Sequence, residues 1–415
     1  MFNLEFLFIL ILLISNFCVA ETRYTFESFL YAQKNQVADS IINPENQVLK
    51  VAVGEYHLDL RGEFKWRSEE KQLVVRPRFL GHQSNIELNN KTEVEAKGQA
   101  DLTDAFYENY WTPKLSTTLG LQVYQWGPAE FLNASNPLYH FNPRQKSAVY
   151  KEKGQILLRF NFSPSMQSNY IFMFQPVSNN EAEWIAEDTF TPKFLLKYEK
   201  TGKKATNYFG VVAGSEEKNN IFFGEYFNFS FFEGFSLYTD MKHAQNRINF
   251  IPEVNGALVN LVPETHSDAQ WPTLAVFGAR WEDTYDVRLE YIYNGMGLSE
   301  SDLNLAVASV SNFTNPAYPQ NLGRFLKPGL ELLGQNYLYV SWRVSDPFRL
   351  RELNLYFRYI CSLQDKSSQM QFEFDRALWE SFLLFSNVSF SNGNIDSEFR
   401  LLNAWQALIG LKWGI

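Results

Sequence analysis

Apolar and polar residues alternate one for one in segment after segment of this chain, and this period of two constrains the fold more than any other feature. In the last segment, 405–415, Trp405 and Trp413 fall on one face, and Gln406 and Lys412 fall on the other. Successive side chains of a strand point to opposite faces, so the segment is expected to form a strand with one apolar and one polar face. A terminal strand of this kind is typical of the closing strand of an outer-membrane β-barrel.

The alternation predicts an all-β fold, a transmembrane antiparallel β-barrel of about eighteen strands. Segment 24–33 also fits an amphipathic helix, with 84–96 as the replacement strand, and we favour 24–33 because 83–101 is polar enough to be a loop. The predicted strands are 24–33, 50–66, 71–81, 103–111, 117–126, 154–164, 167–176, 192–200, 205–214, 220–230, 233–243, 272–282, 285–294, 335–345, 350–362, 368–377, 379–391 and 404–415.

The connections alternate in length, which supports the strand assignment. With both termini in the periplasm, short turns fall on the periplasmic side and long loops outside, except that the outer connections 215–219 and 363–367 are short. The predicted long loops are 34–49, 82–102, 127–153, 177–191, 244–271, 295–334 and 391–403.

The first twenty residues are typical of a signal peptide, with an apolar core over 6–14 followed by Cys18-Val19-Ala20. We therefore predict cleavage before Glu21, leaving 21–415 as the barrel, although the segment before the core lacks Lys and Arg. No later apolar run is long enough for a membrane-spanning helix.

Composition excludes several classes of function. Aromatic residues make up 16% of the chain, which suits a lipid-facing band with aromatic girdles. The net charge of −9 gives no support for nucleic-acid binding. Cys361 is the single cysteine after residue 20, so no internal disulfide is expected. No metal or dinucleotide motif is present, and we predict neither a metal site nor a cofactor.

Charged residues gather on the face that alternation turns inward. In 56–66, Asp59 and Arg61 share a face opposite Leu58 and Leu60. An unpaired Arg or Lys costs roughly 2–4 kcal/mol on the lipid face at mid-membrane, so the charged row is predicted to line a polar lumen. These side chains either pair across neighbouring strands or give the lumen a preference for anions, and both can hold together. The predicted pore-lining residues are Asp59, Arg61, Arg76, Arg78, Arg159, Arg280, Arg288, Arg343, Arg358 and Lys412.

The long loop 127–153 has the composition of a constriction. Gly127-Pro128 ends the preceding strand, and two later Asn-Pro pairs favour extended or turn geometry. The strand's parity points Trp126 into the barrel. We predict that the loop folds into the lumen; the alternative is a loop packed outside the pore. The predicted constriction residues are Trp126, Glu130, Asn133 and Arg144.

The segment from Gln125 to Arg144 resembles a family. Its Trp-Gly, the following acidic residue, the Asn-Pro and the later Pro-Arg are similar to the corresponding segment of alginate-export-like outer-membrane porins. The resemblance implies a barrel of about eighteen strands that passes a solute through an arginine-lined lumen. Members often carry Asp after Trp-Gly, whereas Pro128-Ala129-Glu130 stands here, so the resemblance assigns no substrate.

Together these features predict a non-enzymatic porin of the bacterial outer membrane for small polar or anionic solutes. Its expected partners are outer-membrane lipid, lipopolysaccharide, the barrel-assembly machinery and the solute. One alternative is a barrel hydrolase, for which His266-Ser267-Asp268 and the pair His57 and Asp59 are the candidate residues. Another is an adhesin or receptor without an open pore, which would use the loops 244–271 and 295–334.

Overall fold

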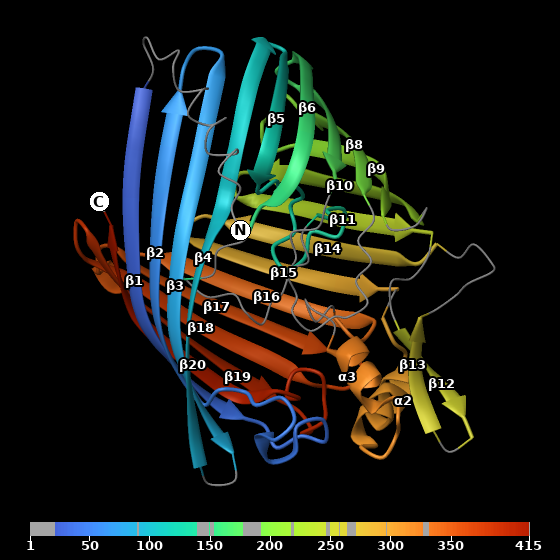
Figure 1. Ribbon diagram of the computed structural model, residues 1–415. Helices are drawn as coiled ribbons and strands as arrows, with labels where there is room; N and C mark the ends of the chain where they lie inside the picture. Colours follow the sequence, from blue (N-terminus) through green and yellow to red (C-terminus); the bar gives the residue numbers. More distant parts are fainter. Residues whose placement is uncertain are drawn as a thin grey trace.

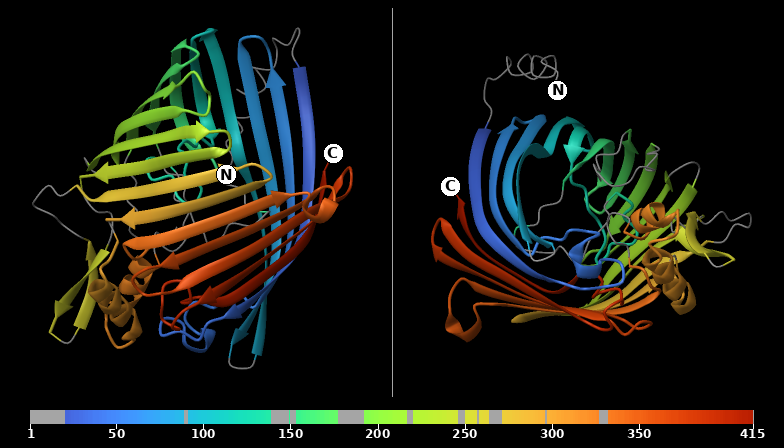
Figure 2. Two further views of the ribbon diagram at one scale, coloured as in Figure 1. Left: turned by 180° about the vertical axis from the view of Figure 1, so that it is seen from behind. Right: turned by 60° about the horizontal axis from the view of Figure 1, so that its bottom comes forward.

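The computed structural model contains one closed barrel of eighteen antiparallel strands (Figures 1 and 2). Strand β1 pairs with β2 on one side and with β20 on the other, where Leu30 lies opposite Leu411, and this pairing closes the sheet. The structure describes residues 21–88, 91–138, 149, 153–176, 192–216, 220–245, 250–256, 258–263, 271–295, 297–326 and 332–414. The predicted signal peptide 1–20, Arg144 and His266-Ser267-Asp268 lie outside these ranges.

Each of the eighteen predicted strands overlaps one strand of the barrel, and the sequence-based prediction of the fold is confirmed. Because β1 covers 24–33, the alternative of an amphipathic helix there is wrong. The barrel strands are β1 (Glu21–Val37), β2 (Gly54–Arg67), β3 (Lys71–Leu88), β4 (Lys91–Thr112), β5 (Leu115–Gln122), β6 (Gln155–Ser165), β7 (Ser168–Gln175), β8 (Lys193–Thr201), β9 (Tyr208–Glu216), β10 (Asn220–Phe232), β11 (Phe235–Ala244), β14 (Thr273–Glu282), β15 (Tyr285–Asn294), β16 (Asn336–Ser345), β17 (Leu353–Ser362), β18 (Ser368–Trp379), β19 (Phe382–Asn392) and β20 (Asn403–Gly414).

One predicted loop, 82–102, is wrong. Strands β3 and β4 stay paired as far as Leu88 and Lys91, so the segment is a hairpin that extends both strands. All ten residues of 91–100 are exposed. The β4 half of this hairpin has water on both faces and needs no apolar alternation, so its polar composition was misread as a loop.

Two of the other long connections contain strands or α-helices within the described residues. The connection 245–272 holds the hairpin β12 (Phe250–Asn255) and β13 (Leu258–Pro263), and 295–335 holds α2 (Glu300–Ser311) and α3 (Tyr318–Phe325). With the 3-10 helix η2 (Pro44–Asn46), they lie at one end of the barrel, called here the loop end. The opposite, short-turn end carries both termini of the barrel and the 3-10 helix η4 (Pro347–Arg349).

The loop-end elements pack on one another through a shared apolar core. Its buried members are Ile42, Leu261, Leu298, Leu303, Ala306, Val310, Phe325 and Leu401. They come from four different connections, so burial of these side chains fixes the connections as a packed cap. No helix within the described ranges is long and apolar enough to cross a bilayer.

The barrel wall has an apolar outside and a polar inside. Leu30, Leu119 and Leu196 are 57–62% exposed on the outer face, whereas the inward carboxylates of Asp59 and Glu290 are fully buried. This distribution is the reverse of that of a water-soluble protein and matches a barrel surrounded by hydrocarbon.

Outward aromatic side chains gather beside the short turns. They belong to the ends of strands that are far apart in sequence, and all are exposed. Such a ring matches the aromatic girdle of a membrane barrel at the boundary of the lipid. Its members include Tyr24, Trp111, Tyr170, Trp281, Tyr285 and Trp379.

Candidate functional site

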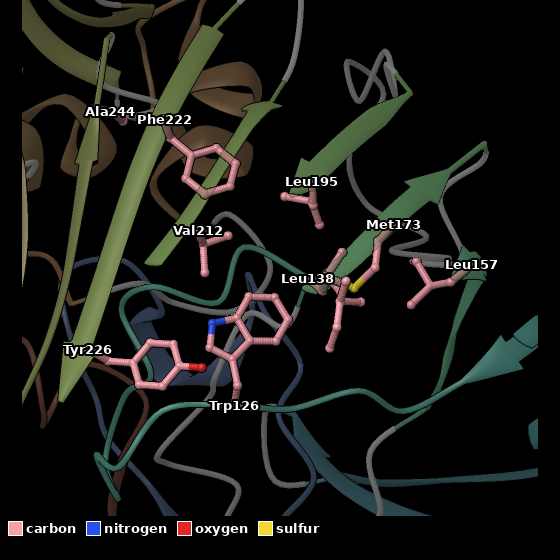
Figure 3. Packing of buried hydrophobic residues seen from close by; sticks show 10 residues of the cluster. Trp126, Leu138, Leu157, Met173, Leu195, Val212, Phe222, Tyr226 and Ala244 are labelled. Carbon is pink, nitrogen blue, oxygen red and sulfur yellow. The ribbon is translucent and has the colours of Figure 1, made fainter. Parts of the chain in front are cut away.

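A loop lies inside the barrel and divides its interior. Residues 123–138, called here the inner loop, follow β5 and cross the space enclosed by the wall (Figure 2). Figure 3 shows Trp126 of this loop among Met173, Val212 and Tyr226, side chains that β7, β9 and β10 direct inward. Trp126 is 6% exposed, so its indole is packed against the wall and not open to the lumen.

The second half of the inner loop packs against the opposite part of the wall. Phe131 belongs to a buried cluster with Tyr238, Ile292 and Tyr339, which lie on β11, β15 and β16. The rings of Phe131 and Tyr339 are 5.0 Å apart between centroids. The loop is thus anchored by aromatic side chains on two different sectors of the barrel.

A buried carboxylate of the wall binds the backbone of the inner loop. Glu290, on β15, accepts hydrogen bonds from the backbone N–H groups of Glu130 at 2.6 Å and Phe131 at 3.1 Å, and from the hydroxyl of Tyr238 at 2.7 Å. A hydrogen bond to an ionised acceptor is stronger than one between neutral groups. These bonds also satisfy backbone N–H groups of the inner loop, which is not part of the sheet.

Asp240, on β11, makes a second contact of the same type. Its Oδ1 accepts a hydrogen bond from the backbone N–H of Ser135 at 2.6 Å. The hydroxyl of Ser135 in turn accepts a hydrogen bond from Trp126 Nε1 at 3.1 Å. Asp240 therefore connects the wall to the same turn of the loop that orients Trp126.

Gly127 is required where the inner loop passes Asp240. Its φ is +95°, and a Cβ built there would lie 2.0 Å from Asp240 Oδ2. Any other residue would combine an unfavourable backbone conformation with a direct clash. This gives a physical reason for the glycine that follows Trp126 in the inner loop.

The side chain of Glu130 connects the inner loop to β15, β16 and β17. Its carboxylate lies 3.2 Å from Arg288 Nε and 3.7 Å from Arg358 Nε. It also accepts hydrogen bonds from Ser341 Oγ at 2.7 Å and from the hydroxyl of Tyr339 at 3.1 Å. One loop carboxylate thus neutralises part of the charge of two wall arginines.

Most predicted pore-lining arginines pair with carboxylates inside the barrel. Arg61 and Arg78 share Asp59, with shortest distances of 2.6 Å and 2.8 Å. The remaining pairs are Arg76 with Glu63 and Asp104, Arg280 with Asp286 and Glu282, Arg288 with Asp286, Arg358 with Glu373, and Lys412 with Glu27. Arg76, Arg78, Arg280, Arg358 and Lys412 pair across strands as expected, whereas Arg61 with Asp59 and Arg288 with Asp286 pair within one strand. The carboxylates balance much of the positive charge.

Two arginines have no carboxylate at salt-bridge distance within the described part of the chain. Arg159 lies over the ring of Tyr124 at 4.4 Å and donates to Thr118 Oγ1 at 3.1 Å. Arg343 lies over the ring of Tyr356 at 5.2 Å and is exposed. Among the predicted pore-lining arginines, Arg159 and Arg343 are therefore the two whose charge no ion pair within the described residues offsets.

Polar space remains inside the barrel. A cavity of about 580 Å³ lies between the inner loop and β9, β10, β11, β14 and β15, where Gln125, Asn133 and Arg288 contribute to its lining. A second cavity, of about 430 Å³, lies against β1, β2 and β17–β20, lined by groups that include Arg61, Asp375 and Lys412. Charges of both signs and neutral amides therefore face the interior.

The possible proton relay of His57 and Asp59 is wrong. Both oxygens of Asp59 are occupied by Arg61 and Arg78. His57 Nε2 lies 3.0 Å from Glu55 instead, and its ring stacks on Tyr31 with centroids 4.5 Å apart. His57 and Asp59 therefore have different partners and do not form a pair.

The sequence-based prediction did not include Asp240 or Asp104 among the inward residues. Alternation offered a signal for Asp240, because in 233–243 it shares its parity with the buried Tyr238. It offered less for Asp104, since a bulge at Arg76 and Pro77 shifts the register beside it.

Structural comparison places this barrel among known folds. OccK5 (OpdH) of Pseudomonas aeruginosa superposes with a TM-score of 0.54 at 6% identity, covering 95% of this chain and 98% of that one. OccAB4 of Acinetobacter baumannii gives 0.53 at 10% identity, and OpdK of Pseudomonas aeruginosa, solved with vanillate, gives 0.54 at 8%; each covers 95% of this chain and 98% of that chain.

Comparison with protein-family models gives no match, and comparison with curated proteins gives none either. The structural neighbours are Occ and Opd outer-membrane porins with eighteen strands. At these identities the likeness concerns the architecture alone, and in architecture this chain has the fold of those porins.

Proposed function

We propose that this protein is an outer-membrane channel through which small polar solutes diffuse down their gradient. The observation that carries the proposal is the combination of an apolar outer wall with an interior that holds paired charges, a fixed loop and two polar cavities, one of them beside that loop. An adhesin or receptor without an open pore needs no loop inside the barrel, whereas a selective pore uses such a loop to narrow its bore.

The inner loop sets the narrow part of the channel in this proposal. Glu130 and Asn133 border the remaining space, and Trp126 holds the loop against the wall. Arg144 belongs to the same loop in sequence and is proposed to act there too. The wall residues Arg288 and Arg358 then face the solute together with Glu130, so both signs of charge contact it.

A finer proposal is a modest preference for anions. It rests on Arg159 and Arg343, which lack a carboxylate at salt-bridge distance among the described residues, and agrees with the vanillate in OpdK. The proposal also includes membership of the alginate-export-like porins and cleavage of a signal peptide before Glu21. It further includes contacts with lipopolysaccharide and with the barrel-assembly machinery. Catalysis is no part of it.

Liposome swelling tests this function directly. Proteoliposomes that contain the purified protein are diluted into iso-osmotic glucose, gluconate or N-methylglucamine chloride, and the swelling rate is compared with that of empty liposomes. We expect faster swelling in every solute that fits the bore, with gluconate entering faster than a cation of similar size. Swelling equal to that of empty liposomes would contradict the channel, and faster entry of the cation would contradict the anion preference.

A further inference from the structure

The outer surface of the barrel has a depression at the loop end. The cavity measures about 930 Å³ and lies over β1, β2 and β20, under the connection that contains η2. Its side chains point away from the lumen, since they alternate with the inward Gln33, Asn35 and Leu408. The residues that form it include Ala32, Lys34, Gly54, Tyr56, Trp405, Ala407 and Ile409.

Small residues create this depression. Lys34 lies opposite Gly54 on β2 and opposite Ala407 on β20, so both of its cross-strand neighbours are small. Ala32 lies between Tyr56 and Ile409 in the next row, and these two are 57% and 55% exposed. A ligand chain can therefore approach the backbone of β1 between larger flanking side chains.

Among the described residues that line the depression, Lys34 is the one cation, and it has no ion-pair partner there. Lys34 is exposed, and no carboxylate lies within salt-bridge distance of it among the described residues. Asp39, Glu45 and Glu87 also line the depression, and Asp39 accepts a hydrogen bond from the backbone N–H of Glu45 at 2.8 Å. These carboxylates repel anions, so an anionic group is favoured only where it contacts Lys34.

Tyr56 and Trp405 place the depression at the boundary between lipid and water. Aromatic side chains with a polar group favour that depth in a membrane. The outer wall below Ala32 continues with the exposed Leu30 and Leu58, which would face hydrocarbon. A lipid bound here has its acyl chain along this apolar wall and its head group at the level of Lys34.

We propose that this depression binds one molecule of lipopolysaccharide through its lipid A, with a phosphate on Lys34 and an acyl chain over Ala32 and Ala407. The inference rests on the proposed outer-membrane location, in which the loop end faces the outer leaflet. Attraction of a basic side chain to anionic lipid supplies the head-group contact, and close packing over small residues supplies the rest.

Native mass spectrometry in detergent with added lipid A tests the site. The wild type is expected to retain one lipid A. Ala32→Trp and Ala407→Trp fill the depression, and Lys34→Gln removes its cation, so each should weaken retention at least tenfold. Ala213→Trp and Lys200→Gln are the matched controls, because both residues are exposed on the outer wall away from the depression.

Retention unchanged in all three site variants would overturn the proposal. Equal retention of diacylglycerol, which carries no phosphate, and lipid A would overturn the phosphate contact at Lys34. The same variants are recorded in planar bilayers, where normal conductance is expected. Normal conductance with unchanged retention contradicts the lipid site alone, whereas absence of conductance in the wild type contradicts the proposed channel.

Discussion

Glu290 is predicted to hold the inner loop inside the barrel, and replacing it should loosen that loop. In Glu290→Gln the side chain keeps its shape, but an amide NH2 group replaces one carboxylate oxygen. This NH2 group cannot accept a hydrogen bond from the backbone N–H of Glu130 or Phe131. At least one of the three hydrogen bonds is lost, and the other two lose their charged acceptor.

The size of the effect follows from these contacts. A hydrogen bond to a charged group contributes about 1.5–3 kcal/mol, and an orphaned buried donor costs a further 1–3 kcal/mol or so. We therefore expect Glu290→Gln to weaken docking of the loop by about 2–4 kcal/mol and Glu290→Ala by somewhat more. Since about 1.4 kcal/mol is tenfold in an equilibrium constant, undocked conformations become at least tenfold more populated.

Single-channel recording in planar bilayers is the assay. A loop that leaves the wall changes the width of the bore, so Glu290→Gln should show more frequent transitions between conductance levels, and Glu290→Ala more still. Glu63→Gln is the control, because this inward carboxylate on β2 pairs with Arg76 and, among the described residues, forms no hydrogen bond or ion pair with the inner loop. Current traces of both Glu290 variants indistinguishable from wild type would refute the reasoning.

Further predictions concern the same interior. Gly127→Ala would place a methyl group 2.0 Å from the Asp240 carboxylate, so its current should also fluctuate, whereas Gly323→Ala, with nothing within 4 Å, should leave the current unchanged. Glu130→Gln removes the negative charge that two arginines share, so the reversal potential in a salt gradient should show greater selectivity for anions. Greater selectivity for cations would contradict this contact. Arg343→Gln removes a cation that has no carboxylate at salt-bridge distance among the described residues, and it should shift the reversal potential in the direction of cation selectivity. Arg144→Glu should alter conductance or selectivity, and unchanged values would remove Arg144 from the constriction.

The barrel could be predicted from sequence because its wall repeats one physical rule. Each strand separates hydrocarbon from a polar interior, so the same alternation recurs and reports the number of strands. The rule fails where both faces meet water. The hairpin of β3 and β4 beyond the barrel rim was therefore assigned to a loop, and β12, β13, α2 and α3 were not separated from the loops that contain them.

The interior site could be predicted only in part. Parity placed the arginines inside, but their ion partners depend on which strands are adjacent and in what register, as Arg76 with Asp104 illustrates. The contacts of Glu290 and Asp240 with the inner loop could not be derived, because backbone N–H groups of a loop carry no sequence signal. Gly127, which leaves room for the Asp240 carboxylate, is the one residue in the sequence that pointed to such a contact.

The central claim is that this wall has lipid outside and water inside, and cysteine labelling tests it most directly. In a Cys361→Ser background, single cysteines replace Asn354, which lines the cavity beside β17, and Leu289, which is 48% exposed on the outer wall. A water-soluble maleimide applied to proteoliposomes should label Asn354→Cys rapidly and leave Leu289→Cys unlabelled. Equal labelling, or labelling of Leu289→Cys alone, would contradict the account.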